Sequence, residues 1–139
     1  MNTDKLRRLV GWIDNRRRPL LNIQFRHGKT VCALLDTGFN GYLLWEASET
    51  ELSDFPGELS SLYESVEVAD GNILVNLAWT NIQWLGDAAP DTGVETFVAV
   101  ASKRRRPGDP SVLLGTALLA GTAVLVDFAG EMLRIEQPT

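Results

Sequence analysis

Val31-Cys32-Ala33-Leu34-Leu35-Asp36-Thr37-Gly38 is the stretch that decides the fold, because an apolar run ends there in a carboxylate. As an extended strand, the run carries apolar side chains on both faces, which predicts a strand inside a sandwich or barrel. Asp36 follows directly, where ionisation of a carboxyl group is costly unless the charge is compensated or has a function. The stretch therefore predicts a buried strand that leads into an active-site loop.

The residues after the carboxylate favour a tight loop. Gly38 permits close approach of the backbone, and Asn40-Gly41 is a strong turn signal before the next apolar stretch. The side chain of Thr37 is both donor and acceptor, which suits a buried hydrogen bond across a symmetric contact. From the tripeptide alone, an ordinary Asp-Gly turn in a hairpin is an equal alternative.

A second apolar segment lies far along the chain. Val112-Leu113-Leu114-Gly115 predicts a buried strand that ends in glycine, and residues 116–121 predict a short helical turn closed by another glycine. Residues 123–128 then predict a further strand. This order of strand, helical turn and strand gives the carboxylate loop a candidate partner.

Together the two segments resemble the retropepsin-like (clan AA) aspartic proteases of the small prokaryotic type, over residues 20–135 or so. The resemblance implies an all-β fold: a closed β-barrel with one short helix after the Leu-Leu-Gly strand and a flap hairpin. It implies that Asp36 is the catalytic residue and that Thr37 and Gly38 complete the active-site loop. The residues that would support this loop are Leu113, Leu114 and Gly115.

A hairpin is predicted between the two segments. Residues 65–69 and 72–77 flank Asp70-Gly71, a strong hairpin turn. In the family that the chain resembles, a flap lies here and closes over the substrate. The implied flap tip is Ala69, Asp70 and Gly71, and a plain structural hairpin is the alternative. Upstream, residues 20–25 and 30–35 predict another hairpin, and residues 46–63 predict a loop with a short helix.

An aspartic protease needs two carboxylates that share a proton and hold a water. A second Asp-Thr-Gly occurs at residues 91–93, but the turn residues Gly86-Asp87-Ala88-Ala89-Pro90 precede it, which predicts a surface loop. A chain of 139 residues is also too short for two lobes with one loop each. The second carboxylate would therefore be Asp36 of another subunit in a two-fold homodimer.

Three positions depart from the family pattern. Phe39 stands where many members have Ser or Ala, so no hydroxyl can bond the carboxylate from there. Ala117 stands where many members have Asp, and Thr116 stands where viral members have Arg. Two functions follow from these observations: a homodimeric aspartic endopeptidase that hydrolyses peptide bonds through a water activated by the Asp36 pair, or a catalytically inactive binding or dimerisation module with the same fold.

The amino-acid composition limits the kinds of partner and cofactor that we expect. The net charge of −5 disfavours nucleic acid, although the runs at residues 16–18 and 103–106 are locally basic. The second run is most simply a solvated loop, with a patch for nucleic acid or an acidic substrate as the alternative. One Cys and one His exclude a structural zinc site of the usual kind within one chain. We therefore expect no metal and no cofactor, and partners limited to a second copy and a peptide or protein substrate.

The chain is expected to form one domain over residues 20–139, after an N-terminal extension at residues 1–19 that is either flexible or a dimer contact. The first residues lack the apolar core of a secretory signal. The longest uncharged stretch, residues 111–126, contains two glycines and is slightly short for a membrane span. A soluble, cytoplasmic protein without a membrane partner is the expectation.

Overall fold

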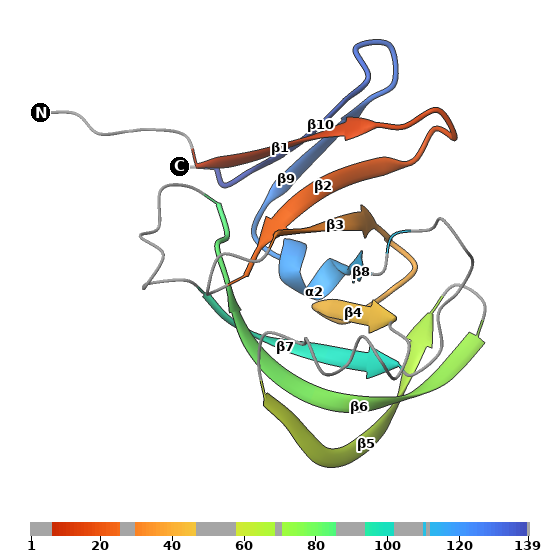
Figure 1. Cartoon of the computed structure of the whole chain (residues 1–139). Coiled ribbons are helices and arrows are strands. Elements are labelled where there is room, and N and C mark those ends of the chain that lie inside the picture. Colours follow the sequence, from red (N-terminus) through yellow and green to blue (C-terminus); the bar gives the residue numbers. More distant parts are fainter. Residues whose placement is uncertain are drawn as a thin grey trace, which may run out of the picture.

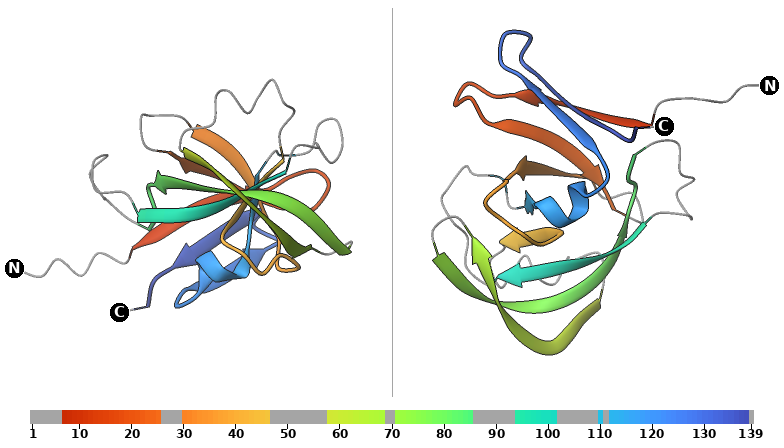
Figure 2. Two further views of the ribbon diagram at one scale, coloured as in Figure 1. Left: turned by 90° about the horizontal axis from the view of Figure 1, so that it is seen from below. Right: turned by 180° about the vertical axis from the view of Figure 1, so that it is seen from behind.

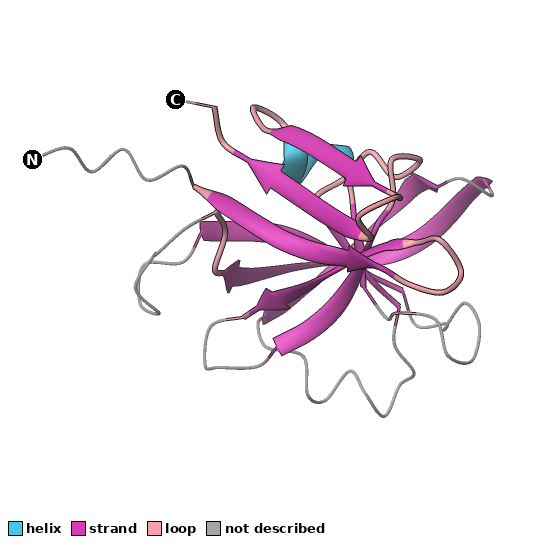
Figure 3. Ribbon diagram, turned by 90° about the horizontal axis from the view of Figure 1, so that it is seen from above, coloured by secondary structure: helices cyan, strands magenta, loops and turns pink. Residues whose placement is uncertain are grey.

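The computed structural model describes residues 7–25, 30–46, 58–68, 71–85, 94–101, 110 and 112–138. Within these residues the chain is mostly β, with one short helix (Figures 1 and 3). The elements in chain order are β1 (Arg8–Ile13), β2 (Pro19–Gln24), β3 (Thr30–Leu35), β4 (Leu43–Glu46), β5 (Glu58–Val68), β6 (Gly71–Ile82), β7 (Val94–Ala101), β8 (Val112–Leu114), α2 (Thr116–Leu119), β9 (Ala123–Asp127) and β10 (Met132–Glu136).

All the strands belong to one sheet with the order β5-β6-β7-β4-β8-β3-β2-β1-β10-β9. Two of its pairings are parallel, β3 with β8 and β4 with β7, and they lie near the middle of the order. The parallel pair β3 and β8 brings the two segments singled out in the sequence side by side, with Leu35 opposite Leu114. The site is therefore built at the carboxyl ends of these two strands.

The sheet is not closed into a barrel, and the prediction of a closed barrel is wrong in this respect. Its edge strands are β5 and β9, which do not pair with each other within the described residues. Instead the sheet curls until Phe25, just after β2, forms an isolated bridge to Ile82 at the end of β6 (Figure 1). The amide of Gln83 also donates to the carbonyl of Gln24 at 2.8 Å. The sheet stays open because β1, β10 and β9 continue the ladder beyond the strand at which it would close.

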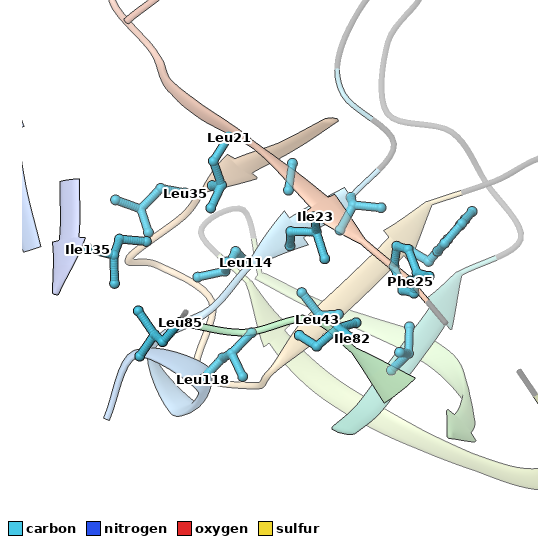
Figure 4. Packing of buried hydrophobic residues seen from close by; sticks show 14 of the residues in the cluster. Leu21, Ile23, Phe25, Leu35, Leu43, Ile82, Leu85, Leu114, Leu118 and Ile135 are labelled. Atoms are coloured by element: carbon cyan, nitrogen blue, oxygen red, sulfur yellow. The ribbon is translucent and has the colours of Figure 1, made fainter. Parts of the chain in front are cut away.

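The strand before Asp36 packs on both faces, as its apolar pattern predicts, with one face buried and the other half-buried. Ala33 and Leu35 belong to the larger core cluster, which Figure 4 shows from close by. Leu34 packs against a smaller cluster on the other face of the sheet. Both clusters continue through β8, where Leu114 lies in the larger one and Leu113 in the smaller. The two strands that carry the site are thus held from both sides.

Two local features differ from the sequence predictions. Residues 8–13 lie within the sheet as β1, between β2 and β10, although the sequence places residues 1–19 in an extension; the domain boundaries themselves remain a prediction. β5 begins at Glu58, so the last third of the segment expected as loop and short helix, residues 58–63, is a strand. Residues 47–57 lie outside the described part of the chain.

The hairpin of β5 and β6 is long and strongly curved (Figures 1 and 2). Its register is irregular between Leu59 and Tyr63, where β5 contains two more residues than the facing segment of β6. The side-chain amide of Asn76 bonds this bulge, because its Nδ2 donates to the carbonyls of Ser60 at 2.6 Å and Leu62 at 2.9 Å. The amide of Leu62 also donates to Oγ of Ser60 at 2.8 Å. A β-bulge bends the strand that carries it, and the side chains of Asn76 and Ser60 hold this one.

Candidate active site

The loop that begins at Asp36 is anchored to β8 by its first amide. The backbone N–H of Asp36 donates to the carbonyl of Leu114 at 2.9 Å, which extends the parallel pairing of β3 and β8 by one more bond. The carboxylate then turns back onto its own loop, where Oδ1 accepts from the amide of Gly38 at 2.9 Å. Asp36 is half-buried, while Thr37 and Gly38 are exposed. The loop therefore presents its carboxyl group at the surface from a rigid base.

The loop is also bonded to the start of α2. The amides of Gly115, Thr116 and Ala117 donate to the carbonyls of Tyr42, Phe39 and Gly41 at 2.9, 2.9 and 3.1 Å. The first amides of a helix have no partner inside the helix, so the loop carbonyls satisfy donors that would otherwise need water. In this contact the loop carbonyls and the amides at the start of α2 satisfy one another.

Gly115 is required by the close approach of these two segments. A Cβ at this position would overlap the carbonyl oxygen of Gly41 and lie 2.6 Å from Cδ2 of Phe39. The backbone itself is extended, with φ −100° and ψ 175°, so any residue could adopt it. The requirement for glycine is therefore one of space, not of backbone conformation.

Phe39 is a core residue, with 1% of its surface exposed. It belongs to the smaller cluster, against which Val66 of β5 and Ile73 of β6 also pack. An apolar anchor thus stands at the position where many members of the resembled family have a small residue. Thr116 adds a weak bond from its Oγ1 to the Phe39 carbonyl at 3.4 Å. The Asp36 loop and the turn end of the β5–β6 hairpin therefore share one apolar cluster.

The predicted flap corresponds to the end of the β5–β6 hairpin. Val68 pairs with Gly71, so Gly71, which the sequence predicts as the second residue of the turn, is instead the first residue of β6. Gly71 has φ +122°, a conformation that side chains rarely adopt, which explains the glycine at this pairing position. Ala69 and Asp70 lie outside the described residues, so their role as a flap tip remains a prediction.

The position of Arg18 was not predicted. The ladder of β2 and β3 ends where Leu20 pairs with Leu34, and the same register continued by two residues would place Arg18 opposite Asp36. Nε of Arg18 donates to Oδ2 of Asp14 at 2.9 Å. The sequence signal that could have revealed this position is the hairpin of residues 20–25 and 30–35, whose continued register reaches both residues.

The remaining features concern a cysteine of β3, two undescribed segments, metal ligands and membrane-spanning helices. Burial raises the pKa of the Cys32 thiol; the charge of Arg18 has a smaller lowering effect, and the charge of Asp14 adds to the increase. The second Asp-Thr-Gly at 91–93 and the basic run at 103–106 are not described. Within the described residues no group of three or more His, Cys, Asp or Glu side chains could hold a metal ion. None of the helical residues described there forms a helix long and apolar enough to cross a membrane.

The comparisons with known proteins support the fold. No protein-family model matches the chain, and no curated protein matches its sequence. Among solved structures, the chain is similar to a retropepsin-like aspartic protease from Rickettsia conorii, with a TM-score of 0.58 and 12% sequence identity. The likeness covers 95% of this chain and 92% of that one. At this identity it shows a shared fold: the chain has the fold of a retropepsin-like aspartic protease.

Proposed function

We propose that the chain is one subunit of a homodimeric aspartic endopeptidase, in which Asp36 of each subunit supplies one of the two catalytic carboxyl groups. The observation that carries the proposal is the rigid mounting of Asp36. Its amide is bonded to β8, and its loop is bonded to the first turn of α2, while the carboxyl group itself stays at the surface. Pre-organised placement of this kind is what a reacting group needs.

The need for a second subunit follows from the chemistry. Two carboxyl groups close together cannot both ionise readily, so one keeps its proton and acts as the acid while the other acts as the base. A two-fold axis beside the Asp36 loop would bring the two groups together without a second motif in the same chain. We assign Thr37 and Gly38 to this contact because both are exposed beside Asp36.

An exposed edge of the sheet supports self-association. β9 is an edge strand that follows α2 directly, and it carries apolar side chains on both faces. Val124, Leu125 and Phe128 are 39%, 44% and 50% exposed. Long apolar edges are usually covered or blunted in native proteins, and pairing with the same strand of a second copy would cover this one.

The reaction would proceed as follows. The ionised Asp36 takes a proton from a bound water as the water oxygen bonds to the carbonyl carbon of the peptide. The protonated Asp36 of the other subunit gives its proton to the carbonyl oxygen, which yields a neutral tetrahedral diol. Proton transfer to the amide nitrogen then allows the C–N bond to break. The β5–β6 hairpin would close over the substrate and exclude bulk water.

The proposal is tested by cleavage of a peptide library with wild type and Asp36→Asn, in the presence of a metal chelator. The amide is nearly isosteric but cannot act as a base, so cleavage should be lost while the fold and the dimer remain. Undiminished cleavage by Asp36→Asn would remove the assignment, and a wild type that cleaves nothing would favour the inactive binding module.

A further inference from the structure

The turn between β1 and β2 lies beside the candidate catalytic loop. The amide of Asp14 donates to the carbonyl of Arg18 at 3.0 Å, which extends the pairing of β1 with β2 into the turn. β2 and β3 are antiparallel, so the turn before β2 lies next to the end of β3. The register of these strands, continued two residues past Leu20 and Leu34, would place Arg18 opposite Asp36 on the same face of the sheet.

The turn is held in one shape by the Asp14 carboxylate. Oδ1 accepts from the amides of Arg16 at 3.0 Å and Arg18 at 2.8 Å, and Oδ2 accepts from Nε of Arg18 at 2.9 Å. The amide of Arg17 donates to the Asp14 carbonyl at 3.0 Å, and Arg17 has φ +65°. Burial alone would raise the pKa of Asp14, but these donors outweigh it and lower the pKa. Asp14 is therefore ionised near neutrality and fixes the positions of the arginines.

The turn is basic in a chain that is acidic as a whole. Three arginines and one aspartate give residues 14–18 a formal charge of 3 − 1 = +2, against −5 for the chain. Arg16 and Arg17 are exposed. The connection between β9 and β10 runs from Asp127 to Glu131 and is acidic. It lies beside the end of β1, where the Ile13 amide donates to the Glu131 carbonyl. The basic turn thus stands between that acidic connection and Asp36.

We propose that this turn is a specificity element that selects peptides with Asp or Glu close to the scissile bond. The inference rests on the proposed peptidase function and deepens it by naming the substrate class. Neighbouring strands lie about 5 Å apart and an extended peptide rises about 3.4 Å per residue, so the turn faces substrate positions about two to three residues from the bond. In a two-fold dimer each subunit contributes one turn, and the preference applies on both sides of the bond.

The test compares matched peptides that differ only in charge. Dye-labelled peptides with an apolar centre carry either Glu or Gln at the flanking positions, and kcat/KM is measured for both. The test variant is the double substitution Arg16→Gln and Arg17→Gln, which leaves the bonds between Asp14 and Arg18 in place. The matched control is Arg7→Gln with Arg8→Gln, which removes the same charge from exposed residues at the far end of β1, about 20 Å away.

Wild type should prefer the Glu peptide by about threefold to tenfold at low ionic strength, since each exposed charge contributes modestly. The double variant should lose most of this preference, the control should keep it, and added salt should weaken it in wild type. A preference that is absent from wild type, or unchanged in the double variant, would overturn the proposal. If wild type cleaves neither peptide, the peptidase assignment falls. Binding of the same peptides to Asp36→Asn, with and without the double substitution, then decides whether the turn selects acidic ligands.

Discussion

Replacement of Gly115 by alanine tests whether the contact between α2 and the Asp36 loop positions the site. The new methyl group would overlap the carbonyl oxygen of Gly41 and lie 2.6 Å from the Phe39 ring and 2.7 Å from the Phe39 carbonyl oxygen. Two of these atoms belong to the backbone, so the loop as a whole must move. The extended backbone of Gly115 suits alanine, so the substitution adds a steric conflict without backbone strain.

The loss of stability in Gly115→Ala can be worked out from the atoms that the new methyl group would meet. Overpacking of a well-packed site costs about 1–3 kcal/mol, and weakening of the bonds from the Thr116 and Ala117 amides adds about 1 kcal/mol. We therefore expect the free energy of unfolding to fall by about 2–4 kcal/mol. For a domain of this size, the melting temperature should fall by about 8–15 °C. Cleavage should fall further than the loss of folded protein explains, because the loop is displaced.

The assay combines thermal unfolding, cleavage per folded molecule and hydrogen exchange of the Asp36 and Thr116 amides. Gly121→Ala is the matched control, because Gly121 has φ +80° but no atom within 4 Å of the position that an alanine methyl group would take. The control should lose about 1–2 kcal/mol through backbone strain while cleavage per folded molecule and exchange at the loop stay as in wild type. Wild-type stability and wild-type protection of the Asp36 amide in Gly115→Ala would refute the reasoning.

Three further outcomes are expected. In Asn76→Ala, two carbonyls of the β5 bulge lose their donor, so the free energy of unfolding in urea should fall by about 1–2 kcal/mol. The control Asn72→Ala changes an exposed residue and should alter stability little. Equal effects of the two substitutions would contradict the role of Asn76 in the bulge. The pKa of Asp14 is lowered, so its charge stabilises the folded state above the ordinary pKa of 3.8, and this stability is lost as the pH falls. Asp14→Asn should therefore be less stable than wild type near neutrality, and its stability should depend less on acid pH. Unfolding curves that run parallel to wild type at every pH would argue against this. Asp91→Ala should cleave peptides at the wild-type rate, and a loss as severe as that of Asp36→Asn would show that the second motif belongs to the site.

The sequence predicts those parts of the fold that depend on local patterns within a few neighbouring residues. The apolar pattern of residues 31–35 places Asp36 at the end of a strand packed on both faces, as the two clusters show. The strand, glycine and helical turn around Gly115 are equally local, and the structure has β8, α2 and β9 in that order. What binds these segments together is a parallel pairing between distant residues, which the resemblance to a known fold suggested.

The parts that the sequence did not predict depend on pairing between distant strands or on packing. β1 was missed because Gly11 interrupts a short strand rich in charge at its start; in the structure the carbonyl of Leu20 occupies the space of a Cβ at Gly11. The open sheet follows from the addition of β10 and β9 to that strand, which no local pattern encodes. From the sequence, Phe39 is notable only because it lacks a hydroxyl group. The burial of Phe39 depends on residues of β5 and β6, which are distant in sequence.

The central claim is that one active site is shared by two Asp36 residues, and a subunit-mixing titration tests it most directly. Wild type is co-refolded with Asp36→Asn at increasing ratios, and cleavage is measured at constant wild-type concentration. Because a mixed dimer has one functional carboxyl group, equal amounts should reduce the activity to about one half, and a ninefold excess should reduce it to about one tenth. Activity that stays constant as the inactive subunit is added would show that each chain works alone and would contradict the account.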